Sequence, residues 1–224
     1  MARIDENTVE SVNQLASSDI VFYMGDRRAE KRLLIVGNSI TRHGPKKDIG
    51  WDGDWGMAAD SPDKDYVHIL QRKLEENGKN VFTMVRQGYI WEGNYTRPDI
   101  LNDFLAEHDF NADIAVFRLG ENISRENLDE KKLYNGLQAF IKHICPSGKV
   151  IFTTCFWANP VVDEVIRRLA EERGDTVVEL GDLGADDSMT AKGKFEHSGV
   201  AAHPGNAGMK AIAERINKIL EKKL

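Results

Sequence analysis

A serine, an asparagine and a histidine occupy places where the sequence pattern predicts loops beside buried strands. Ser39 follows the apolar run 33–36, Asn122 follows the apolar run 114–119, and His203 precedes the last helical stretch. A serine hydroxyl becomes a nucleophile when a nearby base takes its proton, and neutral histidine is the usual base near pH 7. The oxyanion formed in acyl transfer needs hydrogen-bond donors already in place. We therefore predict that Ser39 is the nucleophile, His203 its base and the Asn122 side-chain amide one donor of an oxyanion hole.

The backbone is expected to supply the other donors of that oxyanion hole. These are the N–H groups of Ser39 itself and of Gly88, which follows the apolar run 81–85. Gly88 suits the task because it has no Cβ to block the approach of the oxyanion.

An alternation of apolar runs and helical stripes predicts the elements that bring these residues together. Helical stripes at 66–74, 100–105, 133–144, 161–169 and 212–220 separate or follow short apolar runs at 33–36, 81–85, 114–119, 150–154 and 177–180. This order is typical of βαβ units, which form a parallel sheet covered on both faces. Ligands bind such sheets beyond the carboxyl ends of the strands, where the candidate residues fall.

The chain has no linker, repeat or low-complexity segment, so we expect a single domain over residues 31–224. Residues 1–30 precede the first clear strand and are interpreted as an N-terminal arm or an extra edge element. Within them, the apolar stretch 20–23 could be an added edge strand.

Composition excludes several classes of protein. The 224 residues carry 30 basic and 36 acidic side chains, a net charge of −6, which argues against a nucleic-acid or anionic-membrane partner. The sequence has no apolar run long enough to span a membrane and no signal peptide, so we expect a cytoplasmic protein, with a removed leader as the alternative. Cys145 and Cys155 are too few for a disulfide scaffold and wrongly spaced for zinc. We expect reduced, packed thiols, no cofactor and no metal; the sequence does not indicate the oligomeric state.

Four short motifs resemble the conserved blocks of the SGNH (GDSL-type) hydrolases, in the order of that family. They are Gly37-Asn38-Ser39-Ile40-Thr41, Gly88, Gly120-Glu121-Asn122 and His203-Pro204. The resemblance runs from about Leu33 to the C-terminus, and Asn38 stands where aspartate is more usual. It implies an α/β fold, a flavodoxin-like three-layer sandwich with a five-stranded parallel sheet, and an ester hydrolase without a metal.

One departure from the family concerns the partner of His203. The family usually has an aspartate three residues before the histidine, and here that position is Val200. We therefore expect a Ser39–His203 dyad whose imidazole is oriented by a backbone carbonyl or by a carboxylate from Glu196, Asp186 or Asp187. The alternative is a catalytically inactive, SGNH-like module that binds a sugar.

The tryptophans favour a carbohydrate ester as the substrate, and we expect its acyl group to be acetyl. Trp51, Trp55, Trp91 and Trp157 all fall near the predicted site edge, where aromatic faces can stack on sugar rings. The alternative is that they anchor loops by burying a large area. Asn38 and Glu121 are further candidates for substrate binding.

Charged and titratable residues near the motifs complete the set of candidates. Arg86 and Arg118 interrupt apolar strands and need buried partners, for which Glu121, Glu92 and Glu196 are the candidates. His43 and His197 are weaker candidates for the base. We expect surface or packing roles for the remaining histidines, which are His68, His108 and His143.

Overall fold

A computed structural model describes residues 21–126 and 128–224, so the part of the predicted N-terminal arm in residues 1–20 lies outside the described residues. Its centre is a six-stranded sheet in the order β1-β3-β2-β4-β5-β6. The strands are β1 (Val21–Met24), β2 (Lys31–Gly37), β3 (Val81–Gln87), β4 (Ile114–Arg118), β5 (Lys149–Thr153) and β6 (Thr176–Val178). Strands β2 to β6 are parallel and confirm the predicted five-stranded parallel sheet.

The sixth strand is the extra edge element that the sequence left open. β1 pairs antiparallel with β3, from Val21 opposite Arg86 to Met24 opposite Thr83. The sheet is therefore mixed, with an antiparallel strand added at one edge of the parallel set.

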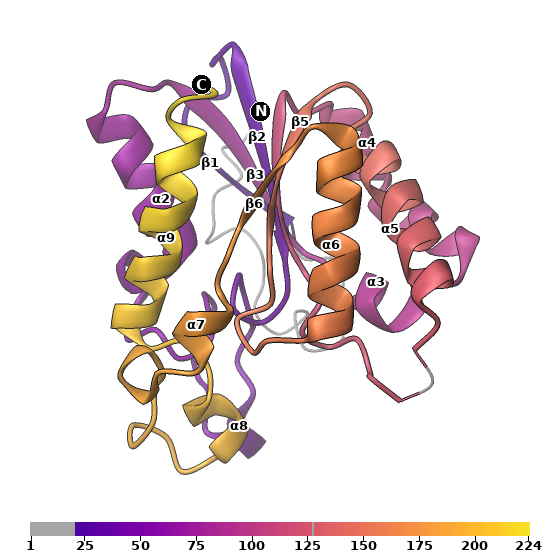
Figure 1. Cartoon of the computed structure of the whole chain (residues 1–224). Helices are drawn as coiled ribbons and strands as arrows, with labels where there is room; N and C mark the ends of the chain where they lie inside the picture. The colour runs from indigo at the N-terminus through magenta and orange to yellow at the C-terminus, as the bar shows by residue number, and fades with distance from the viewer. Residues whose placement is uncertain (1–20, 127) are drawn as a thin grey trace.

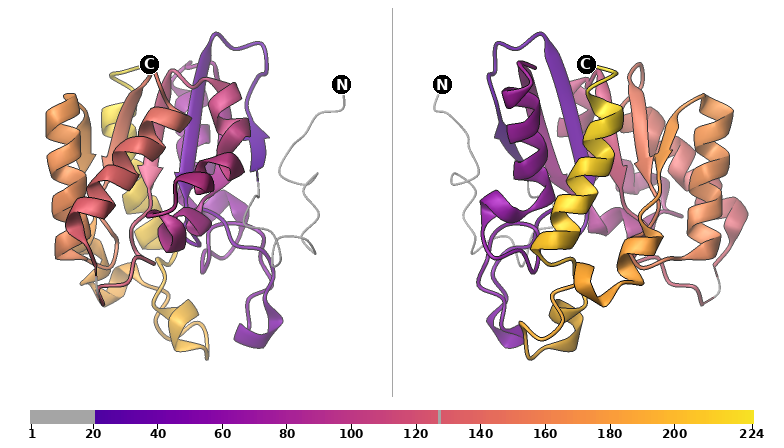
Figure 2. Two further views of the ribbon diagram at one scale, coloured as in Figure 1. Left: turned by 90° about the vertical axis from the view of Figure 1, so that its right-hand side faces the viewer. Right: turned by 60° about the vertical axis from the view of Figure 1, so that its left-hand side comes forward.

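Helices cover both faces of the sheet (Figure 1). α2 and α9 lie side by side on one face, and α5 and α6 lie on the other, as Figure 2 also shows. The α-helices are α2 (Tyr66–Glu76), α3 (Tyr89–Asn94), α4 (Leu105–Phe110), α5 (Glu130–Ile144), α6 (Pro160–Arg173), α7 (Gly181–Gly184), α8 (Ser198–Ala201) and α9 (Asn206–Leu220). The 3₁₀ helices of the described residues are η1 (Lys47–Ile49), η2 (Pro62–Lys64), η3 (Pro98–Phe104) and η4 (Asp187–Met189).

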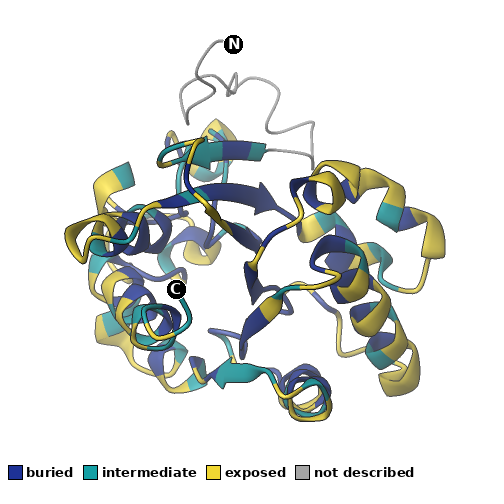
Figure 3. Cartoon of the chain, turned by 90° about the horizontal axis from the view of Figure 1, so that it is seen from above, coloured by how far each residue is buried: buried dark blue, intermediate teal, exposed yellow. Residues whose placement is uncertain are grey.

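Apolar strands explain why the sheet is buried between these layers (Figure 3). One cluster packs β2, β4 and β5 side chains such as Phe117 against α5 and α6, and a second packs side chains such as Ile35 against α2 and α9. Continuous apolar runs are expected of strands covered on both faces. The three-layer α/β/α fold is therefore the predicted one.

Two helix boundaries differ from the sequence reading. Ser61-Pro62 is typical of an N-cap and first helical position, and the sequence therefore predicts that the helix of stripe 66–74 begins there. In the structure this pair begins the 3₁₀ helix η2, whereas α2 begins after Asp65, whose carboxylate accepts the N–H of His68 at 2.8 Å. An aspartate at this position satisfies an otherwise unpaired N–H of the first turn. The predicted stripe at 100–105 is mostly the 3₁₀ helix η3, which α4 continues.

The strand order fixes where a ligand can bind. Strand β2 lies between β3 and β4, and the chain runs from β2 to β3 on one side of it and then crosses back to β4 on the other. Open α/β sheets bind ligands at the crevice where the strand order reverses in this way. Ser39 follows β2, Gly88 follows β3 and Glu121-Asn122 follows β4. No helix of the described residues is long and apolar enough to cross a membrane.

Candidate active site

A tight turn presents Ser39 at the carboxyl end of β2. The carbonyl of Asn38 accepts the N–H groups of Thr41 at 2.9 Å and Arg42 at 3.1 Å, and the carbonyl of Ser39 accepts the N–H of Met57 at 2.9 Å. Within residues 21–126 and 128–224, no acceptor takes the N–H of Ser39. That N–H is free to donate to an oxyanion that forms beside the serine.

His203 lies directly against this serine. The Ser39 Oγ is 2.8 Å from Nε2 of His203, although 164 positions separate the two residues. On the other side of the ring, Nδ1 is 2.7 Å from the carbonyl oxygen of Gly199. Because a carbonyl can only accept, Nδ1 carries the proton of the neutral ring, and Nε2 has a lone pair for the serine proton.

The short helix α8 explains how the ring is held without an aspartate. Its residue Val200 is buried, and its carbonyl accepts the N–H of His203 at 3.0 Å. The carbonyl of His203 accepts the N–H of Ala191 at 2.8 Å, so the backbone is fixed on both sides. Of the two alternatives for orienting the imidazole, the structure has the backbone carbonyl.

The three carboxylates considered for that role have other places. Asp186 accepts the N–H of Ser188, Asp187 pairs with Lys192, and Glu196 is exposed. None of them is bonded to Nδ1 of His203, which the Gly199 carbonyl occupies.

Burial keeps His203 neutral. The pKa of His203 is lowered to about 4, mainly by loss of solvation and to a smaller extent by the nearby His43, although the hydrogen bond to the Gly199 carbonyl raises it. At neutral pH the ring is therefore in the form that can accept a proton.

The predicted oxyanion donors fare differently. Asn122 lines the same cavity as Ser39, and its Nδ2 donates one hydrogen to Glu92 at 2.6 Å, which leaves the second hydrogen available. The N–H of Gly88, by contrast, donates to the Gly37 carbonyl at 2.6 Å and is used by the sheet. This corrects the prediction for Gly88. A Cβ there would lie 2.9 Å from Cγ2 of Val36, so packing in the core explains the glycine.

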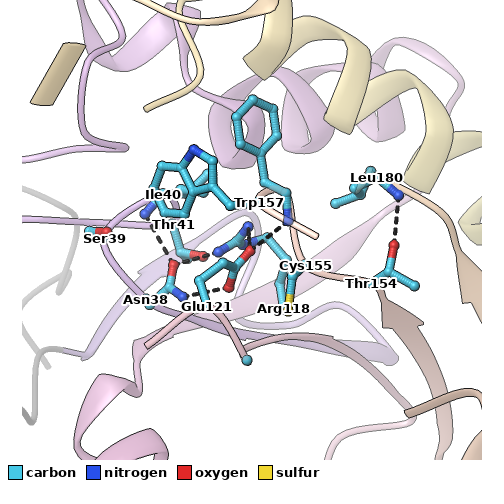
Figure 4. Close-up of polar contacts among 12 residues, drawn as sticks. Asn38, Ser39, Ile40, Thr41, Arg118, Glu121, Thr154, Cys155, Trp157 and Leu180 are labelled. Atoms are coloured by element: carbon cyan, nitrogen blue, oxygen red, sulfur yellow. Dashed lines mark hydrogen bonds and ion pairs between the residues drawn. The ribbon is translucent and has the colours of Figure 1, made fainter. Parts of the chain in front are cut away.

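Beneath Ser39 lies a polar cluster formed by the buried side chains of Asn38, Arg118, Glu121 and Glu92 (Figure 4 shows the first three). Arg118 donates to Glu121 at 2.8 Å and to Oδ1 of Asn38. Nδ2 of Asn38 donates to Glu121 at 2.7 Å and to Glu92 at 3.2 Å. Asn38 is 1% exposed, as is the Glu121 side chain, so both support the site from below. This corrects the prediction that they contact the substrate.

Glu92 is the acceptor at the centre of the block that follows β4. Its Oε1 accepts the N–H groups of Gly120 at 2.6 Å and Asn122 at 3.2 Å, and its Oε2 accepts Nδ2 of Asn122. Gly120 itself has a φ of 141°, a conformation that favours glycine, and this turn carries Asn122 to the site. Burial and the neighbouring carboxylate of Glu121 raise the pKa of Glu92 to about 7.

The dyad opens into a cavity of about 490 Å³. Its polar lining includes Gln87, Tyr89, Asn122, His43, Lys46 and His197 beside Ser39 and His203, and Met57, Ile49 and Val200 add apolar surface. This volume falls in the range of small-molecule sites. His43 and His197 therefore lie at the cavity, but the histidine bonded to Ser39 is His203.

None of the four tryptophans lines this cavity, which corrects their predicted role. Trp91 is 1% exposed and stacks on Phe140 in the core, and Trp51 is 3% exposed. Trp55 is half-buried and donates to the Ala59 carbonyl at 2.8 Å. Trp157 packs edge-on against the His203 ring, with centroids 4.9 Å apart, and donates to the Ala202 carbonyl. They anchor loops and core, the alternative weighed from the sequence.

The strand arginines have partners, one of them unexpected. Arg118 pairs with Glu121 as predicted, whereas Arg86 lies 3.4 Å from Glu107 and donates to the Asp103 carbonyl. The sequence analysis missed Glu107 because it lies on α4, and the 3₁₀ helix η3 directly before α4 does not follow the α-helical repeat of apolar residues. Cys145 and Cys155 are free and buried, as expected. The described residues contain no group of three His, Cys, Asp or Glu side chains arranged to hold a metal.

Several site features were invisible in the sequence. The Gly199 carbonyl is a backbone group that carries no side-chain signal. Tyr89 is 47% exposed at the cavity and follows Gly88 directly, so its place after a strand could have suggested it. Lys46 reaches the cavity through the loop after β2, whose path no periodic pattern reveals.

Comparison with known proteins places the fold. No family model matches the chain, and no curated protein matches it either. Solved structures do match. A lipolytic protein of the G-D-S-L family from Veillonella parvula aligns at 16% identity with a TM-score of 0.54, over 86% of this chain and 99% of that one.

Two carbohydrate esterases align with this chain at similar scores. A family two carbohydrate esterase from Cellvibrio japonicus aligns at 12% identity with a TM-score of 0.55, over 87% of this chain and 62% of that one. A two-domain esterase active on acetylated mannans aligns at 13% identity with a TM-score of 0.52, over 86% of this chain and 49% of that one. This chain thus spans less than two thirds of the length of either esterase, and it shares its three-layer α/β/α fold with all three proteins.

Proposed function

We propose that this protein is a carboxylic ester hydrolase in which Ser39 is the nucleophile and His203 the general base. The observation that carries the proposal is the 2.8 Å contact between Ser39 Oγ and Nε2 of His203, in a ring whose Nδ1 proton is held by a carbonyl. Bases within hydrogen-bond reach of a hydroxyl are the expected arrangement for nucleophilic catalysis.

The reaction proceeds through an acyl-enzyme. Ser39 Oγ attacks the ester carbonyl carbon while Nε2 takes the hydroxyl proton. The carbonyl oxygen, now negative, accepts from the N–H of Ser39 and from the second Nδ2–H of Asn122. The intermediate then collapses, the bond to the leaving alcohol breaks, and His203 gives its proton to that alcohol. Water, activated by the same imidazole, releases the acid and restores the serine.

Small acyl groups, above all acetyl, on a saccharide are the proposed substrates. The fold is shared with a carbohydrate esterase and with an esterase active on acetylated mannans, the latter also crystallised with mannopentaose. Hydrogen-bonding side chains such as Gln87, His43 and Tyr89 around the cavity can contact sugar hydroxyl groups. The cavity volume of about 490 Å³ suits an alcohol of sugar size.

A substrate screen with a matched variant tests this proposal. Wild-type protein and Ser39→Ala are incubated with p-nitrophenyl esters of increasing acyl length and with acetylated mono- and oligosaccharides. We expect acetyl esters to be preferred, and Ser39→Ala to lower kcat by at least about 10³-fold with an unchanged melting temperature. Equal turnover by the variant would remove the assignment of Ser39. Saccharide binding without any turnover would instead favour a sugar-binding module.

A further inference from the structure

Glu92 is a buried carboxylate that the reaction itself does not use. It lies on α3, is 1% exposed, and points to the turn after β4 that carries Asn122. Four N–H donors converge on it: the backbone N–H groups of Gly120 and Asn122 and the side-chain amides of Asn38 and Asn122. A buried carboxylate satisfied this fully fixes the groups that donate to it.

We propose that Glu92 is a positioning residue of the oxyanion hole, which holds the Asn122 amide so that its second N–H stays directed into the cavity beside Ser39. This inference rests on the proposed function. The side-chain amide of Asn122 can rotate about its Cβ–Cγ bond, and the 2.6 Å hydrogen bond from Nδ2 to Oε2 of Glu92 prevents that rotation. Donors fixed before the reaction cost no reorganisation when the oxyanion forms.

The two oxygens of Glu92 have separate tasks, which suggests a selective variant. Oε1 accepts the backbone N–H groups of Gly120 and Asn122, whereas Oε2 accepts the Asn122 side chain. In Glu92→Gln, the single amide oxygen must face the backbone donors, because those cannot turn away. The new NH₂ group then faces Nδ2 of Asn122, donor against donor. The variant keeps shape and burial but releases the Asn122 amide.

We expect Glu92→Gln to lower kcat for p-nitrophenyl acetate by about 10²-fold with little change in KM, since an oxyanion donor acts mainly in the transition state. Glu107→Gln is the matched control, because Glu107 is equally buried but pairs with Arg86 away from the dyad. It should lose stability and keep its kcat. A Glu92→Gln variant with wild-type kcat would overturn the inference.

A double-mutant cycle separates positioning from general destabilisation. If Glu92 acts through Asn122, Glu92→Gln should have almost no further effect on kcat in an Asn122→Ala background. An equal loss in both backgrounds would contradict the inference. Ser39→Ala, assayed in parallel, reports on the proposed function separately: full activity there refutes the nucleophile, whatever Glu92 does.

A crystal structure of Glu92→Gln gives a readout that needs no activity. The Asn122 side chain should leave its present rotamer, or turn its amide so that Oδ1 faces residue 92. An Asn122 amide that keeps its present orientation in the variant would overturn the inference even if no ester were turned over.

Discussion

At the scale of single residues, the protonation of His203 decides when Ser39 can be a nucleophile. Its ring donates through Nδ1 to the Gly199 carbonyl, a neutral acceptor that fixes the tautomer but adds no negative charge. A carboxylate at that position would stabilise the imidazolium, whereas a carbonyl leaves burial to dominate. The base is therefore weak, and it is available over a wide range of pH.

We expect the limb of the kcat/KM profile that belongs to His203 to fall as the pH drops through about 4, the pKa to which burial lowers this residue. Protonation of Glu92, whose pKa is raised to about 7, releases the Asn122 amide and gives a separate limb, which Asn122→Ala should remove. Activity requires the neutral ring, so protonation at lower pH removes it. The pH dependence of p-nitrophenyl acetate hydrolysis measures this. Protein held at pH 4 and assayed again at pH 7 controls for acid unfolding. In Asn122→Ala, an acidic limb centred near 6.5, the ordinary pKa of histidine, would contradict the role of burial.

The residue before Ser39 leads to a second prediction. Asn38 donates to two buried carboxylates, Glu92 and Glu121, and accepts from Arg118. An aspartate, the more usual residue of the resembled family, would lose both donor contacts and add a third carboxylate. We expect Asn38→Asp to lower the free energy of unfolding by about 3–5 kcal/mol at pH 7 in urea titrations.

Asn102→Asp, at an exposed position of η3, is the matched control for the added charge and should be nearly neutral. If Asn38→Asp were as stable as this control, the buried network would not have the charge distribution described here.

At the scale of elements, the helix α8 supplies a backbone carbonyl to orient His203, where the resembled family has an aspartate. The helix is four residues long, and it places the Gly199 carbonyl against the imidazole while Val200 packs into a small cluster with Trp51, Met57 and Ala191. The Val200 side chain therefore packs in this cluster and does not orient the imidazole, as an aspartate at this position would.

Restoring the family residue should consequently be harmful. We expect Val200→Asp to lower stability by about 3–5 kcal/mol, because it buries a carboxylate without a partner, and to lower kcat rather than raise it. Thermal unfolding and p-nitrophenyl acetate hydrolysis measure the two effects. Val200→Thr, similar in shape and uncharged, is the control. Higher kcat in Val200→Asp would mean that an acid can reach His203 after all.

Elements also mark the limit of what the sequence predicts. Apolar runs located every parallel strand, because burial on both faces leaves a continuous signal. The start of α2 at Asp65 and the 3₁₀ helix η3 were missed, since short irregular turns carry little periodicity. The tryptophans were misplaced for a related reason: the pattern locates Trp91 near Gly88 but does not say that its ring turns into the core.

At the scale of the whole molecule, one sheet joins two apolar layers. Leu137 of α5 belongs to the cluster on one face and Ile212 of α9 to the cluster on the other, and both are buried. Because β2, β4 and β5 contribute to both clusters, the layers should unfold together.

We expect a single calorimetric transition whose van't Hoff and calorimetric enthalpies agree. Leu137→Ala and Ile212→Ala should each lower stability by about 2–5 kcal/mol and shift that one transition as a whole. Two resolved transitions, or a variant that moves only part of the heat absorption, would contradict a single cooperative domain.

The feature of the site that the sequence predicted best is which strand ends meet at it. Parallel strands bring their carboxyl ends to one edge, which is why Ser39 and Asn122 could be placed together from the sequence. The network of Asn38, Glu92, Glu121 and Arg118 could not, because hydrogen-bond partners between separate elements depend on side-chain directions that spacing does not encode. A backbone carbonyl was one of several alternatives for orienting His203, and for the same reason the sequence could not say that it belongs to Gly199.

Covalent labelling of Ser39 tests the proposed dyad most directly. Wild-type protein, Ser39→Ala and His203→Ala are incubated with a fluorophosphonate at pH 7, and the adduct is located by peptide mass spectrometry. An activated serine should give one adduct, on Ser39, absent in Ser39→Ala and at least about 10²-fold slower to form in His203→Ala. An unlabelled Ser39, or a Ser39 labelled equally fast without the imidazole, would contradict the dyad.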